Sequence, residues 1–364
     1  MQTAWQTLSP ELLDLIVQHH IDDHPSLYTA SLVCRNWNQA TRYHIFGRVR
    51  LPLGRCERLK TFIALVRHPK CTFAAHNGVK SAIRELSLVP PNLDGGEITA
   101  GMRGELEELA RLAGARSLTI YYPRLMPAIC LAVLTGAFQG IQKLAFKIRF
   151  STLADGIRFA CSFDGLEELG FDAVRAAVGE YPGEDLVMPQ GLKKLTLCSL
   201  RGHEVWFADK RVASLTELAL HNIHPIKDAG RLDLILATLG AQLKSLTIIF
   251  AAQKGDLEIQ TDLSPLTTLR YLELDVSSIS RKSVLQALLK LPTPVTHLES
   301  LTWCARRSSF EGLSAEHWTS LDDLLANGTA FPALQKIDVT ASTGGKYDVT
   351  ERLNKCAARK ILSQ

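Results

Sequence analysis

A short hydrophobic pattern recurs along most of the chain. An apolar residue is followed by a second one three positions later and by a third one two positions after that, and successive triplets lie about 28 residues apart. Because the second and third residues are two positions apart, both point to one face of a strand. The pattern therefore predicts short strands with one buried face. The triplets are Ile83/Leu86/Leu88, Ala115/Leu118/Ile120, Ile141/Leu144/Phe146, Leu166/Leu169/Phe171, Leu192/Leu195/Leu197, Leu215/Leu218/Leu220, Leu243/Leu246/Ile248, Leu269/Leu272/Leu274, Leu298/Leu301/Trp303 and Leu334/Ile337/Val339.

Helical patterns lie between several of these strands. They cover residues 127–138, 229–239, 280–291 and 315–325. A strand followed by a helix at this period resembles a leucine-rich-repeat solenoid, in which stacked units complete one another's core. The resemblance covers residues 80–344, although most units lack the family's Asn after the strand, and Asn222 is the best match. An irregular α/β stack is the alternative. Segments 90–104 and 173–190 are predicted as loops.

The first fifty residues follow a different pattern. Ser9 is a suitable helix N-cap, Pro10 fits the first helical position, and Glu11 is favoured near the positive end of the helix dipole. A helix is therefore expected to begin here. The other predicted elements are helices at residues 25–34 and 37–46 and an extended segment at residues 49–51.

The apolar residues of the first helix form two stripes. One stripe consists of Leu12, Leu15 and Ile16, and the other of Leu13, Ile16 and Val17. Three short helices cannot bury both stripes together with the apolar residues that follow. Some of this surface must therefore pack against the repeats or against another protein. A helical cap on the end of the solenoid is an alternative that explains part of it.

Three sequence strings in this region resemble the F-box in its fungal form. They are Leu8-x-Pro-Glu-Leu-Leu, Ser31-Leu-Val-Cys-Arg-x-Trp37 and Arg42-x-x-x-Phe46, within residues 7–51. Ser9 stands where many family members carry Pro. The segment from Val349 to Leu362 is similar to the closing helix of fungal F-box proteins with degenerate leucine-rich repeats.

The resemblance implies a function and a set of contact residues. It implies that the head docks onto the SKP-family adaptor of a cullin–RING ubiquitin ligase and that the repeats hold a protein substrate. An aromatic residue in such a surface is typical of a binding hot spot. The implied adaptor-binding residues are Leu8, Pro10, Leu12, Leu13, Ile16, Leu32, Val33, Cys34 and Trp37.

The fold class predicted from these patterns is α/β, with an all-α head followed by a solenoid of parallel short strands alternating with helices. The expected parts are an F-box-like helical domain at residues 1–51, a linker or capping helix at 52–79, a solenoid of about ten repeats at 80–344, and a C-terminal capping helix at 345–364.

Composition excludes several classes of protein. The 364 residues include 41 Lys and Arg against 37 Asp and Glu, and the net charge of +4 is too small to indicate a nucleic-acid partner. A 46% hydrophobic content excludes wholesale disorder. The apolar stretches fall short of the ~18 residues that span a bilayer, and no signal peptide is visible. Eight cysteines without a Cys-x-x-Cys pair favour a reducing compartment, the cytoplasm or nucleus.

No catalytic or phosphate-binding motif is present in the sequence, so we expect neither an enzyme nor a cofactor. The cluster from His19 to His24 contains three histidines and two aspartates at the end of a predicted helix. A solvated polar loop is a better interpretation of this cluster than a metal site. Gly344-Gly-Lys346 lacks the earlier glycine of a phosphate loop.

The residues that alternate with the buried leucines are expected on the concave side of the solenoid. Their charges alternate in sign from repeat to repeat, which suits a protein epitope better than a phosphate backbone. A solvated face without a partner is the alternative. The sequence thus predicts a non-catalytic substrate receptor of an SCF-type ubiquitin ligase, or else an interaction scaffold that acts outside ubiquitin transfer. The candidate substrate-binding residues are Tyr121, Lys143, Lys147, Glu168, Asp172, Lys194, Glu217, His221, Tyr271, Glu273 and Asp275.

Overall fold

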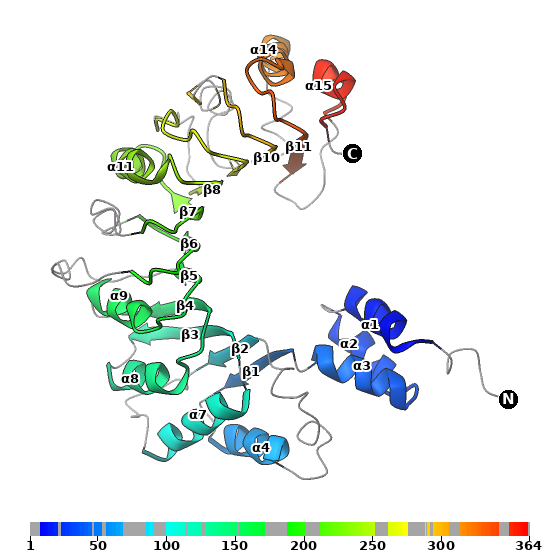
Figure 1. The fold of residues 1–364 in the computed structure, drawn as a ribbon, viewed down its shortest axis with the longest axis vertical. Helices are drawn as coiled ribbons and strands as arrows, with labels where there is room; N and C mark the ends of the chain where they lie inside the picture. The colour runs from blue at the N-terminus through cyan, green and yellow to red at the C-terminus, as the bar shows by residue number, and fades with distance from the viewer. Residues whose placement is uncertain are drawn as a thin grey trace. The chain divides into compact units, whose positions relative to one another are not determined.

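The computed structural model describes most of the chain as a series of strands and helices (Figure 1). The described residues are 8–20, 23–45, 47–52, 56–67, 85–89, 100–113, 115–125, 128–150, 153–171, 188–200, 212–251, 261–275, 288, 290–291, 294–305, 314–341 and 349–362. The chain divides into two compact units. Unit 1 is Met1–Arg149 with Ser162–Leu166, and unit 2 is Phe150–Cys161 with Glu167–Gln364.

The elements follow the order that the sequence predicts. Unit 1 contains α1 (Pro10–His19), α2 (His24–Ser31), α3 (Arg35–Ile45), β1 (Arg48–Pro52), α4 (Cys56–Arg67), β2 (Glu85–Val89), α7 (Ala100–Ala113), β3 (Ser117–Leu125), α8 (Ala128–Ala137) and β4 (Lys143–Arg149). Unit 2 contains α9 (Leu153–Cys161), β5 (Glu168–Phe171), β6 (Lys194–Leu197), β7 (Glu217–Ile223), α11 (Ala229–Leu239), β8 (Ser245–Phe250), β9 (Tyr271–Asp275), β10 (Ser300–Ala305), α14 (Ala315–Ala326), β11 (Lys336–Ala341) and α15 (Asn354–Ala358).

In unit 1 the strands lie side by side in the order β1 to β4, and in unit 2 in the order β5 to β11. Pairing within each unit is parallel and keeps the repeats in register, so that Leu195 lies opposite Leu218 and Leu218 opposite Leu246. The last two residues of every predicted triplet fall in β2 to β11 and are buried. This confirms the predicted strand pattern and the parallel pairing of the strands within each unit.

Helices supply the other half of the core. Four residues of α11 are buried at the spacing of one helix face: Leu232, Ile235, Leu236 and Leu239. The predicted helices at 127–138, 229–239 and 315–325 are confirmed as α8, α11 and α14. Most of the predicted helix at 280–291, and most of the predicted loops at 90–104 and 173–190, lie outside the described residues.

The three N-terminal helices share a small core of their own. Val17 of α1, Leu27 of α2 and Ile45 of α3 are buried together. Nε2 of His44 in α3 lies 2.7 Å from a carboxylate oxygen of Asp14 in α1, which links these two helices. We call α1, α2 and α3 the head.

Local signals explain where the head helices begin. The Ser9 hydroxyl accepts a hydrogen bond from the Leu12 N–H, as predicted for the N-cap of α1. Helix α2 begins at His24, one residue before the predicted start, because Asp23 is its N-cap. The Asp23 carboxylate accepts hydrogen bonds from the Ser26 hydroxyl and from the Ser26 N–H, and these bonds lower the pKa of Asp23.

The end of the chain differs from the predicted capping helix at 345–364. Within residues 349–362 only α15 is helical, because the chain leaves the helix where Lys360 takes a left-handed conformation with φ 59°. The Ile361 carbonyl then accepts a hydrogen bond of 2.6 Å from the Ile337 N–H, and Leu362 forms a parallel bridge with Ile337. The final residues therefore pair with β11 instead of continuing the helix.

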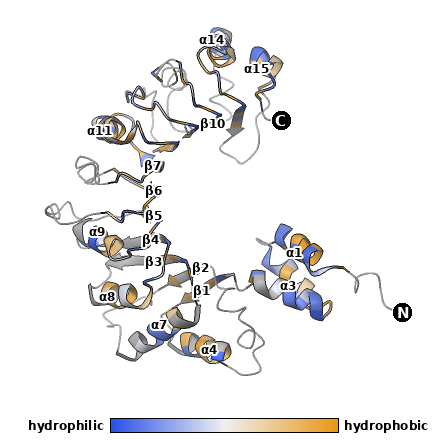
Figure 2. Cartoon of the chain, in the orientation of Figure 1, coloured by the Kyte–Doolittle hydropathy of each residue, from blue (hydrophilic) through white to orange (hydrophobic). Residues whose placement is uncertain are grey.

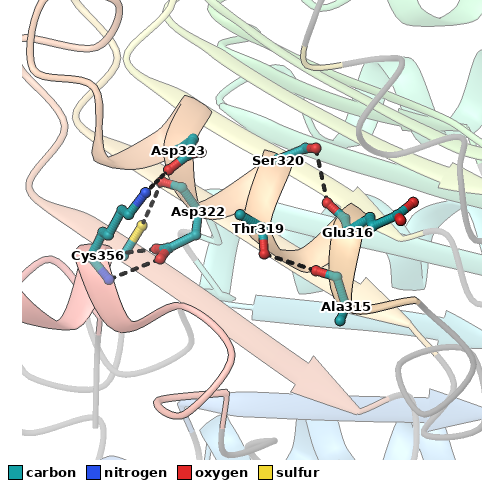
Figure 3. A network of polar contacts seen from close by, with 8 residues as sticks. Ala315, Glu316, Thr319, Ser320, Asp322, Asp323 and Cys356 are labelled. Carbon is teal, nitrogen blue, oxygen red and sulfur yellow. Dashed lines mark hydrogen bonds and ion pairs between the residues drawn. The ribbon is translucent and has the colours of Figure 1, made fainter.

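A buried carboxylate joins α15 to α14 (Figure 3). The two Asp322 carboxylate oxygens accept hydrogen bonds of 2.9 Å from the Lys355 and Cys356 N–H groups. The side chain of Lys355 pairs with the neighbouring Asp323. Leu353, the N-cap residue of α15, has no side-chain oxygen, so Asp322 supplies the cap from another helix.

Candidate interaction surfaces

Helix α1 carries both hydrophobic and hydrophilic residues (Figure 2), and its apolar residues lie in two different surroundings. Leu13 and Val17 are buried, whereas Leu12, Leu15 and Ile16 are exposed. Leu12 retains 50% of its accessible surface. One stripe therefore completes the head's own core, and the other is left in solvent within the described part of the chain.

The C-terminal end of α2 adds a second exposed apolar group. Leu32 is 84% exposed and Val33 is 60% exposed, and Tyr28, one helical turn before Leu32, is also exposed. Surface apolar residues are common singly, but six of them on or just after two helices that share one small core make the head a candidate interaction site. The head patch is defined as Leu12, Leu15, Ile16, Tyr28, Leu32 and Val33.

Some of the predicted adaptor-binding residues serve the head's own packing. Leu13 is buried, so its side chain is not available at the surface, which corrects its assignment to the docking face. Trp37 is half-buried against the head core, and its indole N–H is buried without a hydrogen-bond acceptor among the described residues. Leu8 and Cys34 are half-buried, and Pro10 is exposed.

Leu15 and Tyr28 are the members of the head patch that were not among the predicted adaptor-binding residues. The helical period places Leu15 in the same apolar stripe as Leu12 and Ile16, but it was not assigned to the docking face. Tyr28 follows from its spacing of four residues from Leu32 on α2. The predicted adaptor-binding residues follow the family motif, and the motif includes neither of these two positions.

In each unit, the residues that alternate with the buried strand positions form the open face of the sheet. In unit 1, two rows cross the four strands in register. The first row is Arg48, Glu85, Ser117 and Lys143, and the second is Arg50, Ser87, Thr119 and Ala145. Arg48 is 3.1 Å from Glu85. The guanidinium carbon of Arg50 lies 5.5 Å from the ring centroid of Tyr121, in the range of a cation–π contact.

The open face of unit 2 is more acidic. Lys194 lies 3.4 Å from Glu217, so these two predicted contact residues neutralise each other. Glu273 accepts a hydrogen bond from the Thr247 hydroxyl, and the exposed Tyr271 donates one to Glu299, both at 3.2 Å.

Three acidic positions of unit 2 fall close together in the register of β9 to β11. Glu273 and Asp338 lie on either side of Thr302, and Asp275 follows Glu273 on the same face. Lys336 pairs with Asp338. Glu168 and His221 are half-buried on β5 and β7.

The charge on the open face changes sign from β1 to β2, from β5 to β6 and from β6 to β7, but the balance of charges differs between the units. In unit 1 the described charges on the open face are Arg48, Arg50 and Lys143 against the single carboxylate of Glu85, and in unit 2 the acids outnumber the bases. The reason is β1, which sequence analysis assigned to the head although residues 46, 49 and 51 carry the same apolar spacing as the triplets. Its pairing with β2 adds two arginines to unit 1.

Two of the predicted contact positions are only partly placed. Asp172 lies outside the described residues. The backbone of Lys147, four residues beyond Lys143, pairs with that of Tyr121, and the side chain of Lys147 is not described.

Among the described residues, no helix is long and apolar enough to cross a membrane. The same residues contain no group of three or more His, Cys, Asp or Glu that could hold a metal ion. Burial raises the pKa of the Cys161 thiol to about 11, and burial together with the Asp322 contact raises that of Cys356 to about 12.

Comparison with known proteins gives matches in structure and none in sequence. No protein-family model matches the chain, and no curated protein is similar to it. One similar solved structure is the leucine-rich repeat-containing protein LegL7 from Legionella pneumophila, at 16% identity and a TM-score of 0.44, over 87% of this chain and 94% of that one. Another is a protein from Bacteroides fragilis, at 12% identity and a TM-score of 0.38, over 87% of this chain and 72% of that one.

Proposed function

We propose that the chain is a non-catalytic interaction protein that acts as the substrate receptor of an SCF-type, cullin–RING ubiquitin ligase. In this proposal the head patch docks the SKP-family adaptor, and the open face of the repeat sheet holds a protein substrate. The proposal places the receptor in the cytoplasm or nucleus.

The observation that supports the adaptor site is that some apolar residues of α1 are buried in the core of the head and others are exposed. A helix that only capped the solenoid would bury its apolar residues within the chain, whereas Leu12, Leu15 and Ile16 stay exposed while Leu13 and Val17 fill the core. Leu32 and Val33 are more exposed still. Burying such side chains in an interface stabilises it by about 25 cal/mol per Å² of apolar surface, which favours a protein partner over continued hydration.

The strings that resemble the F-box run through this same patch. Leu12 belongs to the first string, and Leu32 and Val33 to the second. The resemblance and the exposure are independent of each other, because exposure depends on how the helices pack. Their coincidence supports an adaptor of the SKP family over an unrelated partner.

The decisive test is binding of the full chain to a purified SKP-family adaptor. We expect Leu12→Asp and Leu32→Asp each to weaken binding about thirtyfold or more, since loss of a central apolar anchor typically costs ~2 kcal/mol. Leu234→Asp is the matched control, because Leu234 is a similarly exposed leucine on α11 in unit 2. Trp37 is a poorer target, since its loss would also damage the head's packing.

Equal adaptor binding by both head variants and the wild type would refute the docking face. A second assay separates the two classes of function. A substrate receptor should co-purify with the cullin scaffold as well as the adaptor, and its loss should cause a bound protein to accumulate. An interaction scaffold outside ubiquitin transfer would bind its partner without either effect.

A further inference from the structure

We propose that the open face of unit 1 binds an extended peptide segment with anionic side chains, carboxylate or phosphate, and that Arg50 is its principal anchor. This inference rests on the proposed function, in which the sheet holds the substrate. The proposal concerns β1 to β4 only and does not depend on the head patch.

Arg50 is held in place before any ligand arrives. It lies on β1, whereas Tyr121 lies on β3, so the Arg50 side chain reaches across β2 to the tyrosine ring. The residue opposite Arg50 on β2 is Ser87, whose small side chain leaves room for this path. The cation–π contact with the ring restrains the guanidinium, whose N–H groups can then donate to a carboxylate or phosphate.

The charge balance of this face favours an anion. Arg50 makes no ion pair within the described ranges, and Glu85 is the one carboxylate among the described residues of the two rows. Lys143 is exposed on β4 at the far side of the sheet from β1 in this unit. A bound anion would therefore meet positive charge at both sides of the face.

Small hydroxyl side chains lie between these cations. Ser87, Ser117 and Thr119 occupy the open face of β2 and β3, where their O–H groups can donate hydrogen bonds to anionic oxygens. Such short side chains let an extended backbone approach the sheet closely. Adjacent strands are about 4.8 Å apart, so β1 and β4 are separated by roughly 14 Å, the length of about four residues of extended peptide.

These dimensions define the ligand more closely. An extended peptide of about four residues or more spans the four strands and would place an anionic side chain at Arg50. A nucleic acid fits less well, because its binding depends on many Lys and Arg contacts to phosphates, and Arg48, Arg50 and Lys143 are the cations among the described residues of the two rows. An anionic peptide is thus the partner that the face fits.

The test uses the full chain and a phage-displayed library of random peptides of about twelve residues, long enough to cross all four strands. Sequences retained by the wild type should be enriched in Asp and Glu, and this enrichment should disappear with Arg50→Gln. A retained peptide is then synthesised with its acidic residues intact, with the corresponding amides, and with phosphoserine in their place. Binding of each is measured by fluorescence anisotropy, together with a single-stranded RNA of similar length.

We expect Arg50→Gln to weaken binding of the acidic peptide about tenfold or more, because one charge-assisted contact is lost. Tyr121→Leu should weaken binding less, since the cation remains but is no longer held. Lys193→Gln is the matched control, being an exposed cation of unit 2 that is already paired with Glu167 and was not assigned to the binding face. Circular dichroism of each variant checks that the sheet is retained.

Tighter binding of the phosphoserine form would support the proposal and identify phosphate as the preferred source of charge. Equal binding of the amide and acidic peptides, an unchanged affinity in Arg50→Gln, or a preference for RNA would overturn it. Adaptor binding by the same preparations is measured in parallel. A wild type that binds the adaptor but does not select acidic peptides therefore refutes only this inference, and a wild type that selects acidic peptides but does not bind the adaptor refutes only the adaptor proposal.

Discussion

The contact between α14 and α15 allows a sharp test of how the end of the chain is held, because two neighbouring aspartates face different surroundings. Asp322 is 3% exposed and accepts two backbone hydrogen bonds of 2.9 Å from α15. The side chain of Asp323 is 52% exposed and pairs with the Lys355 ammonium. Replacing each by Asn removes one negative charge with almost no change in shape.

The expected effects differ strongly. Asparagine at position 322 offers one acceptor where the carboxylate offers two, so one N–H of α15 is left buried and unpaired. A hydrogen bond to a charged group contributes about 1.5–3 kcal/mol, and an unpaired buried donor adds its desolvation cost, so we expect Asp322→Asn to lose about 2–4 kcal/mol. Asp323→Asn should change the free energy of unfolding little, because water screens the exposed pair.

Hydrogen exchange measured by mass spectrometry is the appropriate assay, since it reports local opening of residues 349–362 separately from global unfolding. A loss of about 2–4 kcal/mol corresponds to exchange roughly 30-fold or more faster in that segment, at about 1.4 kcal/mol per factor of ten. Peptides from β5 to β7 serve as the internal reference. Similar exchange in the two variants, or normal protection of residues 349–362 in Asp322→Asn, would refute the capping role of this carboxylate.

Two further outcomes are expected. Gly240→Ala should destabilise unit 2 by about 1–3 kcal/mol in thermal unfolding, because an added Cβ would lie 2.5 Å from the Leu236 carbonyl oxygen. Gly230→Ala is the control. It should be neutral or stabilising, because nothing lies within 4 Å of a Cβ added there. At pH 8 the Cys161 and Cys356 thiols should resist alkylation in the native chain, because their raised pKa values of about 11 and about 12 keep them protonated. Both thiols should react after the chain is unfolded. Rapid alkylation of either thiol in the native chain would contradict this prediction.

The regular part of the fold was predictable because its signals are local. A triplet such as Leu192/Leu195/Leu197 specifies a strand by itself, and the strand it predicts is present as β6. The Ser9 cap of α1 depends only on residues within one turn and was likewise predicted. In both cases the physical cause lies within a few residues of the feature.

Features that depend on distant residues could not be predicted in this way. In the sequence, Asp322 looks like an ordinary polar residue of a helix. Its role as a cap depends on two N–H groups of α15, which lie more than thirty positions later in the chain. The contact of Arg50 with Tyr121 requires the register of three strands. Leu12 and Leu13 are chemically identical neighbours, and only the packing of three helices decides which of them is exposed.

The sequential order of the strands in unit 2 also determines how that unit should respond to mechanical force. Each strand from β6 to β10 bonds only to the strand before it and the strand after it along the chain, so tension applied at the C-terminus loads one interface at a time. The Ile337–Ile361 hydrogen bond and the Asp322 cap would yield first, followed by β11 and then β10. In an optical trap we expect the strands to unfold one after another in small extension steps. When the force is lowered they should refold in the reverse order, because each folded strand offers its edge for the next strand to pair with.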